Sequence, residues 1–452
     1  MSAFRVFFGL FAAFFLSTQA LAFPAKLGVG PDNNHALLSN TIRSARSRLD
    51  INIYQLESQT IAKTLIGRIQ KGIQVRLLIE AQPFGSMSAE GIQILEQIRD
   101  EMSLAANKGN HLYLMYRKFP GGDRRFVYNH AKYIVVDGKK VWISSENFTN
   151  KGHALPGYVG NRGWDTVLSD LTFATQMTKL FEQDADPALD DVLEVGPGDA
   201  IPGSQSDSGG PTPDEGPMAS NGKLRTLPPI AEAEGQIESV TLVTSPLANQ
   251  PLIDLIRSAK SHLSVEHMSL PSVWYAGPNP YMSPLVAELI AAAERGVHVR
   301  VLLNDNDAFG RADQGSDKSD DGPGRLRNQA NSRAYTLAKP ANEITVELLN
   351  SLRQQRQIPL FARIINVERA QISYIHNKGI LVDSDLTLVS SINGSRNSVH
   401  FNREVAVLLK SRDANAYYGG AFDFDWNQSE VPASWNENPL ASLTNWFFLQ
   451  LH

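Results

Sequence analysis

The sequence predicts an α/β fold of two similar lobes, each a mixed, mostly parallel sheet flanked by helices, with pseudo-two-fold symmetry between them. Three observations support this prediction. The 452 residues exceed one ordinary domain and fit two. Apolar residues make up 42% of the chain, which is enough for a core in each lobe. Finally, short segments of the first half recur in the same order in the second half.

The repeat consists of four pairs of matching segments. Four matches in one order indicate two copies of a single module, which is longer than the units of solenoid proteins. The pairs are IRSARSRL (42–49) with IRSAKSHL (256–263), KGIQVRLL (71–78) with RGVHVRVL (295–302), HAKYIVVD (130–137) with HNKGILVD (376–383), and Asn-Arg at 161–162 with Asn-Arg at 402–403.

Within each copy, helices and strands alternate, which is typical of a sheet covered by helices. In the first copy, apolar residues at helical spacing predict a helix at 59–72, which Gly72 ends. The expected elements are a helix closing at 45–49, a strand at 51–56, a helix at 59–72 and a strand at 73–80, followed in the second copy by a strand at 264–270, a helix at 284–296 and a strand at 297–304.

Residues 1–22 read as a secretory signal peptide. Arg5 precedes an apolar run, and Ala20-Leu21-Ala22 provides a cleavage site of small residues. We therefore expect an exported protein, either periplasmic or secreted. The alternative for this segment is an uncleaved membrane anchor.

The other domain boundaries follow composition. A stretch rich in Gly, Pro, Ser and Asp predicts a flexible linker at 196–235. This linker separates an N-terminal lobe at 23–195 from a C-terminal lobe at 236–432. A similar stretch at 306–342 is expected to be a mobile insertion, and residues 433–452 form a C-terminal tail.

Charge and cysteine content exclude several classes of function. The 47 Asp and Glu outnumber the 42 Lys and Arg, and the net charge of −5 argues against a non-specific polyanion binder. A local basic cleft stays compatible with this balance. The absence of Cys excludes disulfides, a thiol nucleophile, iron–sulfur clusters and cysteine-based zinc sites.

The third matched segment brings chemical groups together on a predicted hairpin. His130 and Lys132 alternate on a strand and so share a face. Asp137 is an odd number of residues away and meets a turn signal, which separates it from the histidine. Ser145 and Asn147 share a face of the returning strand, so the hairpin presents imidazole, ammonium, hydroxyl and amide groups.

The second copy repeats this pattern with His376, Lys378, Asp383, Ser391 and Asn393 at the same spacing. A metal site is disfavoured because a fixed ammonium repels a cation. A phosphate fits, since Lys, Asn and Ser stabilise its oxygens while His attacks phosphorus or protonates a leaving oxygen. Two copies around one phosphodiester predict a phosphohistidine intermediate, with no metal and no cofactor.

The pattern H-x-K-x4-D followed by S-x-N, present twice, resembles the phospholipase D superfamily. The resemblance covers most of both halves and implies two α/β lobes that share one active site at their interface. It implies His130 as nucleophile and His376 as general acid, with structural roles for Asp137 and Asp383. The residues expected to bind the substrate phosphate are Lys132, Lys378, Asn147, Asn393, Ser145 and Ser391.

The family also places a carboxylate after the motif, commonly in N-x-E, where it can orient a catalytic histidine. Glu404 has this position in the second copy. In the first copy Gly163 follows Asn-Arg instead, and Asp165 is the expected substitute because it keeps the same strand face. The two halves are therefore not expected to be equivalent.

The expected function is that of an exported phospholipase D-type phosphodiesterase that hydrolyses or transphosphatidylates phospholipid. The predicted export favours a lipid substrate. The segment 271–282 adds Trp274, Tyr275, Tyr281 and Met282, side chains that suit a membrane interface.

Two alternatives stay open. A secreted nuclease acting on DNA or RNA would use Arg117, Lys118, Arg124 and Arg125, just before the first motif, to follow a nucleic-acid backbone. An inactive binding module is the other alternative, and two intact motif copies argue against it. A monomer is expected because one chain carries both copies.

Overall fold

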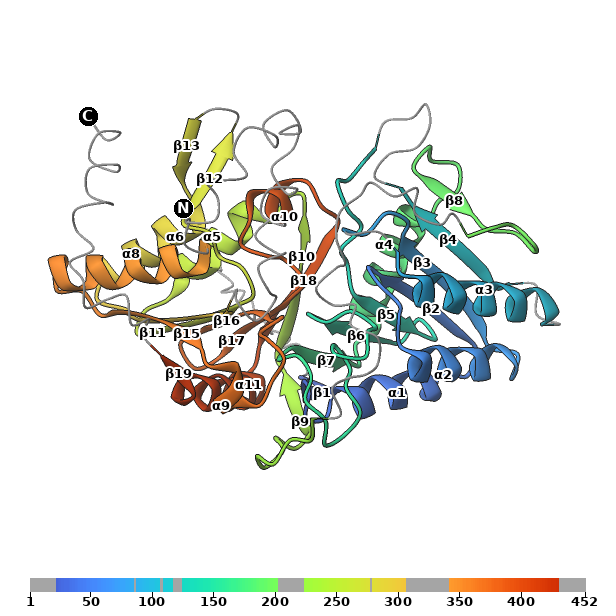
Figure 1. The fold of residues 1–452 in the computed structure, drawn as a ribbon, viewed down its shortest axis with the longest axis horizontal. Coiled ribbons are helices and arrows are strands. Elements are labelled where there is room, and N and C mark those ends of the chain that lie inside the picture. Colours follow the sequence, from blue (N-terminus) through green and yellow to red (C-terminus); the bar gives the residue numbers. More distant parts are fainter. Residues whose placement is uncertain are drawn as a thin grey trace, which may run out of the picture.

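Two lobes lie side by side, each built on one large sheet (Figure 1). The computed structural model describes residues 22–84, 87–105, 109–116, 124–201, 223–276, 279–305 and 341–430. Outside these residues lie most of the expected signal peptide (1–21), linker (202–222) and insertion (306–340), together with the C-terminal tail.

The first lobe has a nine-stranded sheet with helices on both faces. Its elements are β1 (Phe23–Val29), α1 (Asn34–Ser44), β2 (Arg48–Ile53), α2 (Gln59–Ile69), β3 (Gln74–Glu80), α3 (Ala89–Leu104), β4 (His111–Met115), β5 (Tyr133–Val136), β6 (Lys140–Ser144), β7 (Trp164–Leu168), α4 (Leu171–Asp184), β8 (Val192–Glu194) and β9 (Ala233–Ile237). Helices α1, α2 and α3 pack on one face, and α4 packs on the face that meets the other lobe.

The second lobe has an eight-stranded sheet and a separate hairpin. Its elements are β10 (Ser239–Ser245), α5 (Asn249–Ser258), β11 (His262–His267), β12 (Val273–Ala276), β13 (Asn279–Met282), α6 (Pro284–Glu294), β14 (His298–Leu303), α8 (Ala341–Arg356), β15 (Leu360–Ile365), α9 (Val367–Ala370), β16 (Lys378–Val382), β17 (Leu386–Ser390), α10 (Arg396–His400), β18 (Glu404–Lys410), α11 (Arg412–Asn427) and β19 (Ser429–Glu430). Helices α5, α6 and α8 cover one face, and α11 packs on the other.

The repeat in the sequence is a repeat of topology. The order β4-β3-β2-β5-β6-β7-β1 in the first sheet corresponds to β15-β14-β11-β16-β17-β18-β10 in the second. The sheets are mixed, as predicted, but "mostly parallel" needs correction. Among the described strands, parallel pairing is confined to β2–β3–β4 and β11–β14–β15. The motif hairpins and the strands beyond them pair antiparallel, because strands that return directly need no crossover helix.

The repeated segments form the expected elements, with shifts at their ends. The helix expected at 59–72 is α2, and the strand expected at 73–80 is β3. The helix expected to close at 45–49 ends earlier, at Ser44, because the chain there already turns into β2. Strand β5 begins only at Tyr133, so the first motif histidine and lysine precede the strand rather than lying on it.

The motif aspartates hold turns at the ends of β5 and β16. Asp137 Oδ1 accepts hydrogen bonds from the backbone N and Oγ of Ser47, both at 2.7 Å, and Asp383 Oδ1 accepts the same pair from Ser261, both at 2.8 Å. Partial burial acts in the opposite direction, but these donors hold the pKa of both carboxyls below its usual range. Gly138 continues the first turn at φ +64°, where a residue without a side chain avoids strain. Ser47 and Ser261, which are matched in the sequence repeat, thus each bond the motif aspartate of their own copy.

The lobes share one apolar core. It joins β5, β6 and β7 to β16, β17 and β18, with α4 and α11 packed on either side. At its centre the Trp164 ring stacks on the Tyr418 ring, with centroids 4.7 Å apart. A Cβ added at Gly379 would come within 2.3 Å of the Trp164 ring, so only glycine allows this approach. Close side-chain packing, and not the linker alone, therefore joins the lobes.

The chain passes from one sheet to the other at a single residue. Strand β9 pairs with β1 of the first sheet, and β10 begins at Ser239 in the second. The boundary expected at 235 therefore falls within β9. Among the residues described, no helix has the length and apolar character needed to cross a membrane.

Candidate active site

Backbone hydrogen bonds from the opposite lobe hold both motif histidines. The His130 N–H donates to the Arg403 carbonyl at 2.8 Å, and the His376 N–H donates to the Arg162 carbonyl at 2.9 Å. Each arginine returns a bond, from Arg403 N to the Tyr128 carbonyl and from Arg162 N to that of Tyr374. The Asn-Arg segments of the repeat thus fix the histidine of the other copy.

Glu404 orients His130 from across the interface. Its Oε2 lies 2.8 Å from His130 Nδ1. The carboxylate is fully buried and also accepts hydrogen bonds from Ser391 Oγ, Ser398 Oγ and Asn402 Nδ2. Burial alone would raise its pKa, but the attraction of His130 and Lys132 and these donors lower it. Glu404 is therefore ionised and accepts a hydrogen bond from Nδ1–H, which leaves Nε2 of His130 with its lone pair.

The imidazole of His130 is neutral at physiological pH. Burial lowers its pKa to about 4; Glu404 opposes this shift, and the ammonium groups of Lys132 and Lys378 add to it. Lys378 belongs to the other lobe, so a charge of the second motif copy acts on the histidine of the first. A neutral imidazole is the form that can attack phosphorus.

His376 has a carboxylate partner that sequence reasoning missed. Its Nδ1 lies 3.0 Å from Oε2 of Glu146, the residue between Ser145 and Asn147 in the first copy. Burial raises the pKa of Glu146 to about 7, against the opposing charge of Lys378. The signal in the sequence was an acidic residue inside S-x-N, at a position that is Ile392 in the second copy.

The structure places Asp165 elsewhere than expected. Its carboxylate accepts from Ser144 Oγ at 2.6 Å and lies 3.2 Å from both Trp142 Nε1 and His153 Nε2. These partners lie inside the first lobe. Asp165 lies on the same strand face as Gly163, as expected. It is two residues further along β7, however, and its carboxylate faces partners of its own lobe. Asp165 is therefore not the partner of a motif histidine.

The motif lysines are both fully buried. Lys132 Nζ donates to the His130 carbonyl at 2.8 Å and lies 5.3 Å from the centre of the Tyr54 ring. Lys378 Nζ donates to the His376 carbonyl in the same way. Each lysine ammonium is thus hydrogen-bonded to the backbone of the histidine in its own motif.

The motif serines and asparagines lie just beyond β6 and β17. Ser145 Oγ accepts from the Trp164 N–H, while Ser391 Oγ donates to Glu404 at 2.6 Å. Both hydroxyls therefore support the framework behind the histidines. Asn147 Nδ2 donates to Gln55 Oε1 at 2.9 Å, and Asn393 is partly buried, with its backbone N bonded to Ser398 Oγ.

The segment 271–282 forms the hairpin β12–β13, which projects from the second lobe (Figure 1). Trp274 anchors it: the side chain is buried, and Nε1 donates to the Gly394 carbonyl, next to Asn393. Tyr275 and Tyr281 remain 47% and 39% exposed. The hairpin thus stands beside the second motif and presents two aromatic rings to solvent.

The basic segment before the first motif is only partly described. Arg117 and Lys118 lie outside the described residues, and Arg124 is exposed. Arg125 is committed to the protein, because its Nε bonds Asp191 at 2.9 Å and its other nitrogens bond the carbonyls of Gln183 and Asp184.

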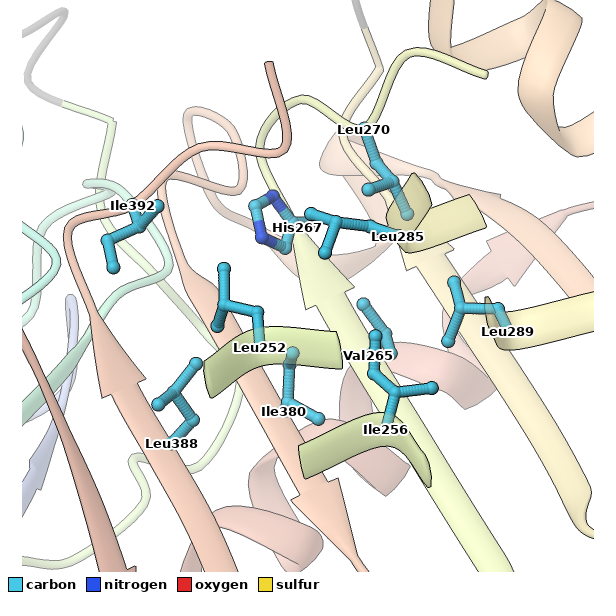
Figure 2. Close-up of a pocket in the computed structure, with 10 residues that line it drawn as sticks. All are labelled: Leu252, Ile256, Val265, His267, Leu270, Leu285, Leu289, Ile380, Leu388 and Ile392. Atoms are coloured by element: carbon cyan, nitrogen blue, oxygen red, sulfur yellow. The ribbon is translucent and has the colours of Figure 1, made fainter. Parts of the chain in front are cut away.

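An apolar cavity of about 10 Å³ lies in the second lobe, around His267 and Leu270 (Figure 2). Ile392 is one of its lining residues, so the residue between Ser391 and Asn393 belongs to apolar packing. In the described part of the chain, no group of three or more His, Asp or Glu side chains is arranged to hold a metal ion.

A family model described as "Cardiolipin synthase, PLD-like domain" matches residues 38–185 and 252–426, which include both motif copies. The chain belongs to the phospholipase D superfamily. It is thus an enzyme of the phosphodiesterase type, as the sequence predicted. No curated protein matches the chain.

Solved structures agree with the phospholipase D fold. Phosphatidylserine synthase from Haemophilus influenzae Rd KW20 is 14% identical, with a TM-score of 0.60 over 95% of both chains. This likeness shows that the fold extends over both lobes. Nuc from Salmonella typhimurium, a phospholipase D family member, is 19% identical and covers 38% of this chain and 99% of its own, with a TM-score of 0.31.

Proposed function

We propose that the protein is an exported, metal-independent phospholipase D-type phosphodiesterase that acts on phospholipid through a phosphohistidine at His130. One observation carries the proposal: two histidines from different lobes each have Nδ1 against a buried carboxylate from the opposite lobe. With Nδ1 of each ring against a carboxylate, Nε2 of each histidine is left for the substrate in this proposal. It suits two proton-coupled steps at a single phosphorus atom.

In the first step, Nε2 of His130 attacks phosphorus and the bond from phosphorus to the leaving alcohol oxygen breaks. His376 donates a proton to that oxygen. The positive charge that develops on the His130 ring is stabilised by the Glu404 carboxylate, which accepts a hydrogen bond from Nδ1–H at 2.8 Å. The pKa of Glu404 is lowered, whereas that of Glu146, the partner of His376, is raised. This difference supports His130 as the nucleophile.

In the second step, water or an alcohol attacks the phosphohistidine and gives its proton to His376. The bond between phosphorus and His130 breaks, and both histidines return to their starting states. Lys132 and Lys378 supply positive charge for the non-bridging oxygens, with Asn147 and Asn393 as neutral donors. Water gives hydrolysis, and an alcohol gives transphosphatidylation.

Phospholipid is the substrate class that the observations favour. Trp274 anchors the β12–β13 hairpin next to Asn393, and the two exposed tyrosines of that hairpin suit contact with a membrane surface. The matching family model is named for cardiolipin synthase, and the structural relative over the whole chain is a phosphatidylserine synthase. The N-terminal pattern of residues 1–22 supports export.

A substrate comparison tests the proposal. Purified protein is incubated with EDTA and either phosphatidylcholine vesicles or plasmid DNA. Release of choline is the expected result. Nicked DNA without choline release would establish the nuclease instead, and no turnover of either substrate would support an inactive binding module. Loss of activity with EDTA would contradict a metal-independent site.

The acid limb of activity should lie near pH 4. Protonated His130 has no lone pair for attack, so kcat/KM should fall as the pH drops through the His130 pKa of about 4. The measurement is a pH–rate profile on a soluble diester, with stability checked at each pH. An acid limb near the ordinary histidine value of about 6.5 would contradict the assignment of His130 as a buried, neutral nucleophile.

The hairpin tyrosines should matter for vesicles and not for soluble substrate. Replacing Tyr275 and Tyr281 by serine removes two rings from the proposed membrane contact, and we expect about tenfold weaker vesicle binding in co-sedimentation. Turnover of a soluble diester should stay within about twofold. Unchanged vesicle binding would exclude the hairpin as the membrane contact.

A further inference from the structure

The two copies carry their histidine-orienting carboxylate at different positions. In the second copy Glu404 opens β18, and Ile392 lies between the motif serine and asparagine. In the first copy the corresponding residues are Gly163 and Glu146. Strand pairing fixes this correspondence, because Ser144 pairs with Asp165 two residues after Gly163, and Ser390 pairs with Ala406 two residues after Glu404.

Glu146 fills the space that a side chain at 163 would need. A Cβ built on Gly163 would lie 2.3 Å from Oε1 and 2.4 Å from Cγ of Glu146. Glutamates at both positions would therefore clash. The absence of a side chain at Gly163 therefore accompanies the presence of a glutamate at 146: one position has lost the carboxylate and the other supplies it.

We propose that Glu146 is the positioning residue of His376, and that its carboxylate has moved from the strand position used by Glu404 to the turn before it. The assignment of His376 as general acid, on which the kinetic consequences rest, is that of the proposed function. The geometry that supports the exchange is the 3.0 Å approach to His376 Nδ1 together with the complementary space at Gly163.

The relocated carboxylate is held less strongly than its counterpart. Glu404 accepts from His130, Ser391, Ser398 and Asn402. Glu146 accepts a hydrogen bond from Asn161 Nδ2, at 3.2 Å. The two histidines thus have partners of the same chemical type in different surroundings, which matches a division of labour between nucleophile and acid.

Moving the carboxylate back is the direct test. We expect Glu146→Ala to lower turnover of a diester with a poor alkoxide leaving group by about 10- to 100-fold. Adding Gly163→Glu should restore it to within about fivefold. Ser145 and Asn161 correspond to Ser391 and Asn402, so a glutamate at 163 has equivalent donors available. Gly163→Glu alone should remain defective, because Glu146 occupies the space.

The leaving group separates positioning from a general loss of structure. A nitrophenolate departs without protonation, so Glu146→Ala should cost less than about threefold with a nitrophenyl diester. Asp165→Asn is the matched control: it alters a buried carboxylate of the same lobe that contacts no motif histidine, and its effect should be equal on both diesters. Equal losses for Glu146→Ala on both diesters, or no rescue by the exchange, would overturn the proposal.

A measurement on the resting protein keeps the test independent of substrate identity. In the proposed arrangement the proton on His376 Nδ1 points to Oε2 of Glu146, 3.0 Å away, and it should give a downfield NMR resonance that is absent in His376→Asn. This resonance should be lost in Glu146→Ala and return in the exchange variant. Its persistence in Glu146→Ala would overturn the assignment even if the protein cleaves none of the diesters tested.

Discussion

Replacing His130 by asparagine is expected to reduce turnover by about 10⁵-fold or more, since the variant has no nucleophile to form the covalent intermediate. The fold should persist, because the backbone bonds between residue 130 and Arg403 do not involve the side chain. The measurement is diester hydrolysis, together with detection of a phosphorylated histidine in the wild type after denaturation at alkaline pH, where the phosphorus–nitrogen bond survives. Wild-type turnover by the variant would refute the mechanism.

His376→Asn provides the matched control for this experiment. Without a general acid, turnover of alkyl esters should fall by about 10²- to 10⁴-fold. A nitrophenyl ester should still phosphorylate His130, because its leaving group needs no proton. The phosphoenzyme should then accumulate, as nothing activates the incoming water. Phosphorylation at residue 376 in the His130→Asn variant would reverse the two roles.

The second large effect is expected on stability. Arg162 is completely buried between the lobes; its Nε bonds Asp425 at 2.6 Å, and its Nη1 bonds Asp32 at 3.0 Å. Arg162→Ala leaves buried carboxylates without this partner, so the free energy of unfolding should fall by about 3–5 kcal/mol. Urea unfolding followed by tryptophan fluorescence measures this change.

A control for this variant is Lys410→Ala. Lys410 and Glu238 form an ion pair whose side chains are each about half exposed (49% and 50%). Solvent screens such a pair, so its loss should change the free energy of unfolding by less than about 1 kcal/mol. A loss of similar size in Arg162→Ala would mean that the interlobe ion pairs do not hold the halves together.

The sequence predicted the parts of the site that depend on local spacing. His130, Lys132 and Asp137 lie within a few residues of one another, and the turn signal sufficed to separate the aspartate from the histidine and lysine, although these two precede the strand on which parity placed them. The same reasoning applied to the second copy, and the family resemblance supplied the role of Glu404. Repeated segments gave the strands and helices to within a few residues.

What could not be predicted depends on the space between elements. Glu146 compensates for Gly163 only because the turn after β6 and the start of β7 are in contact, which no sequence periodicity records. Asp165 met the parity rule, but its carboxylate bonds Ser144 and His153 of its own lobe. Likewise, alternating helices and strands predicted parallel pairing, whereas the motif hairpins impose antiparallel neighbours.

We expect the reciprocal backbone bonds at Arg162 and Arg403 to make catalytic competence an all-or-none property of the molecule. Separating the lobes by a few ångströms would release both histidines at once, together with both orienting carboxylates. Since both halves belong to one chain, the assembly is an intramolecular reaction driven by a high effective concentration. Specific activity should therefore be independent of enzyme concentration, even at dilutions that would dissociate a site built from two separate chains.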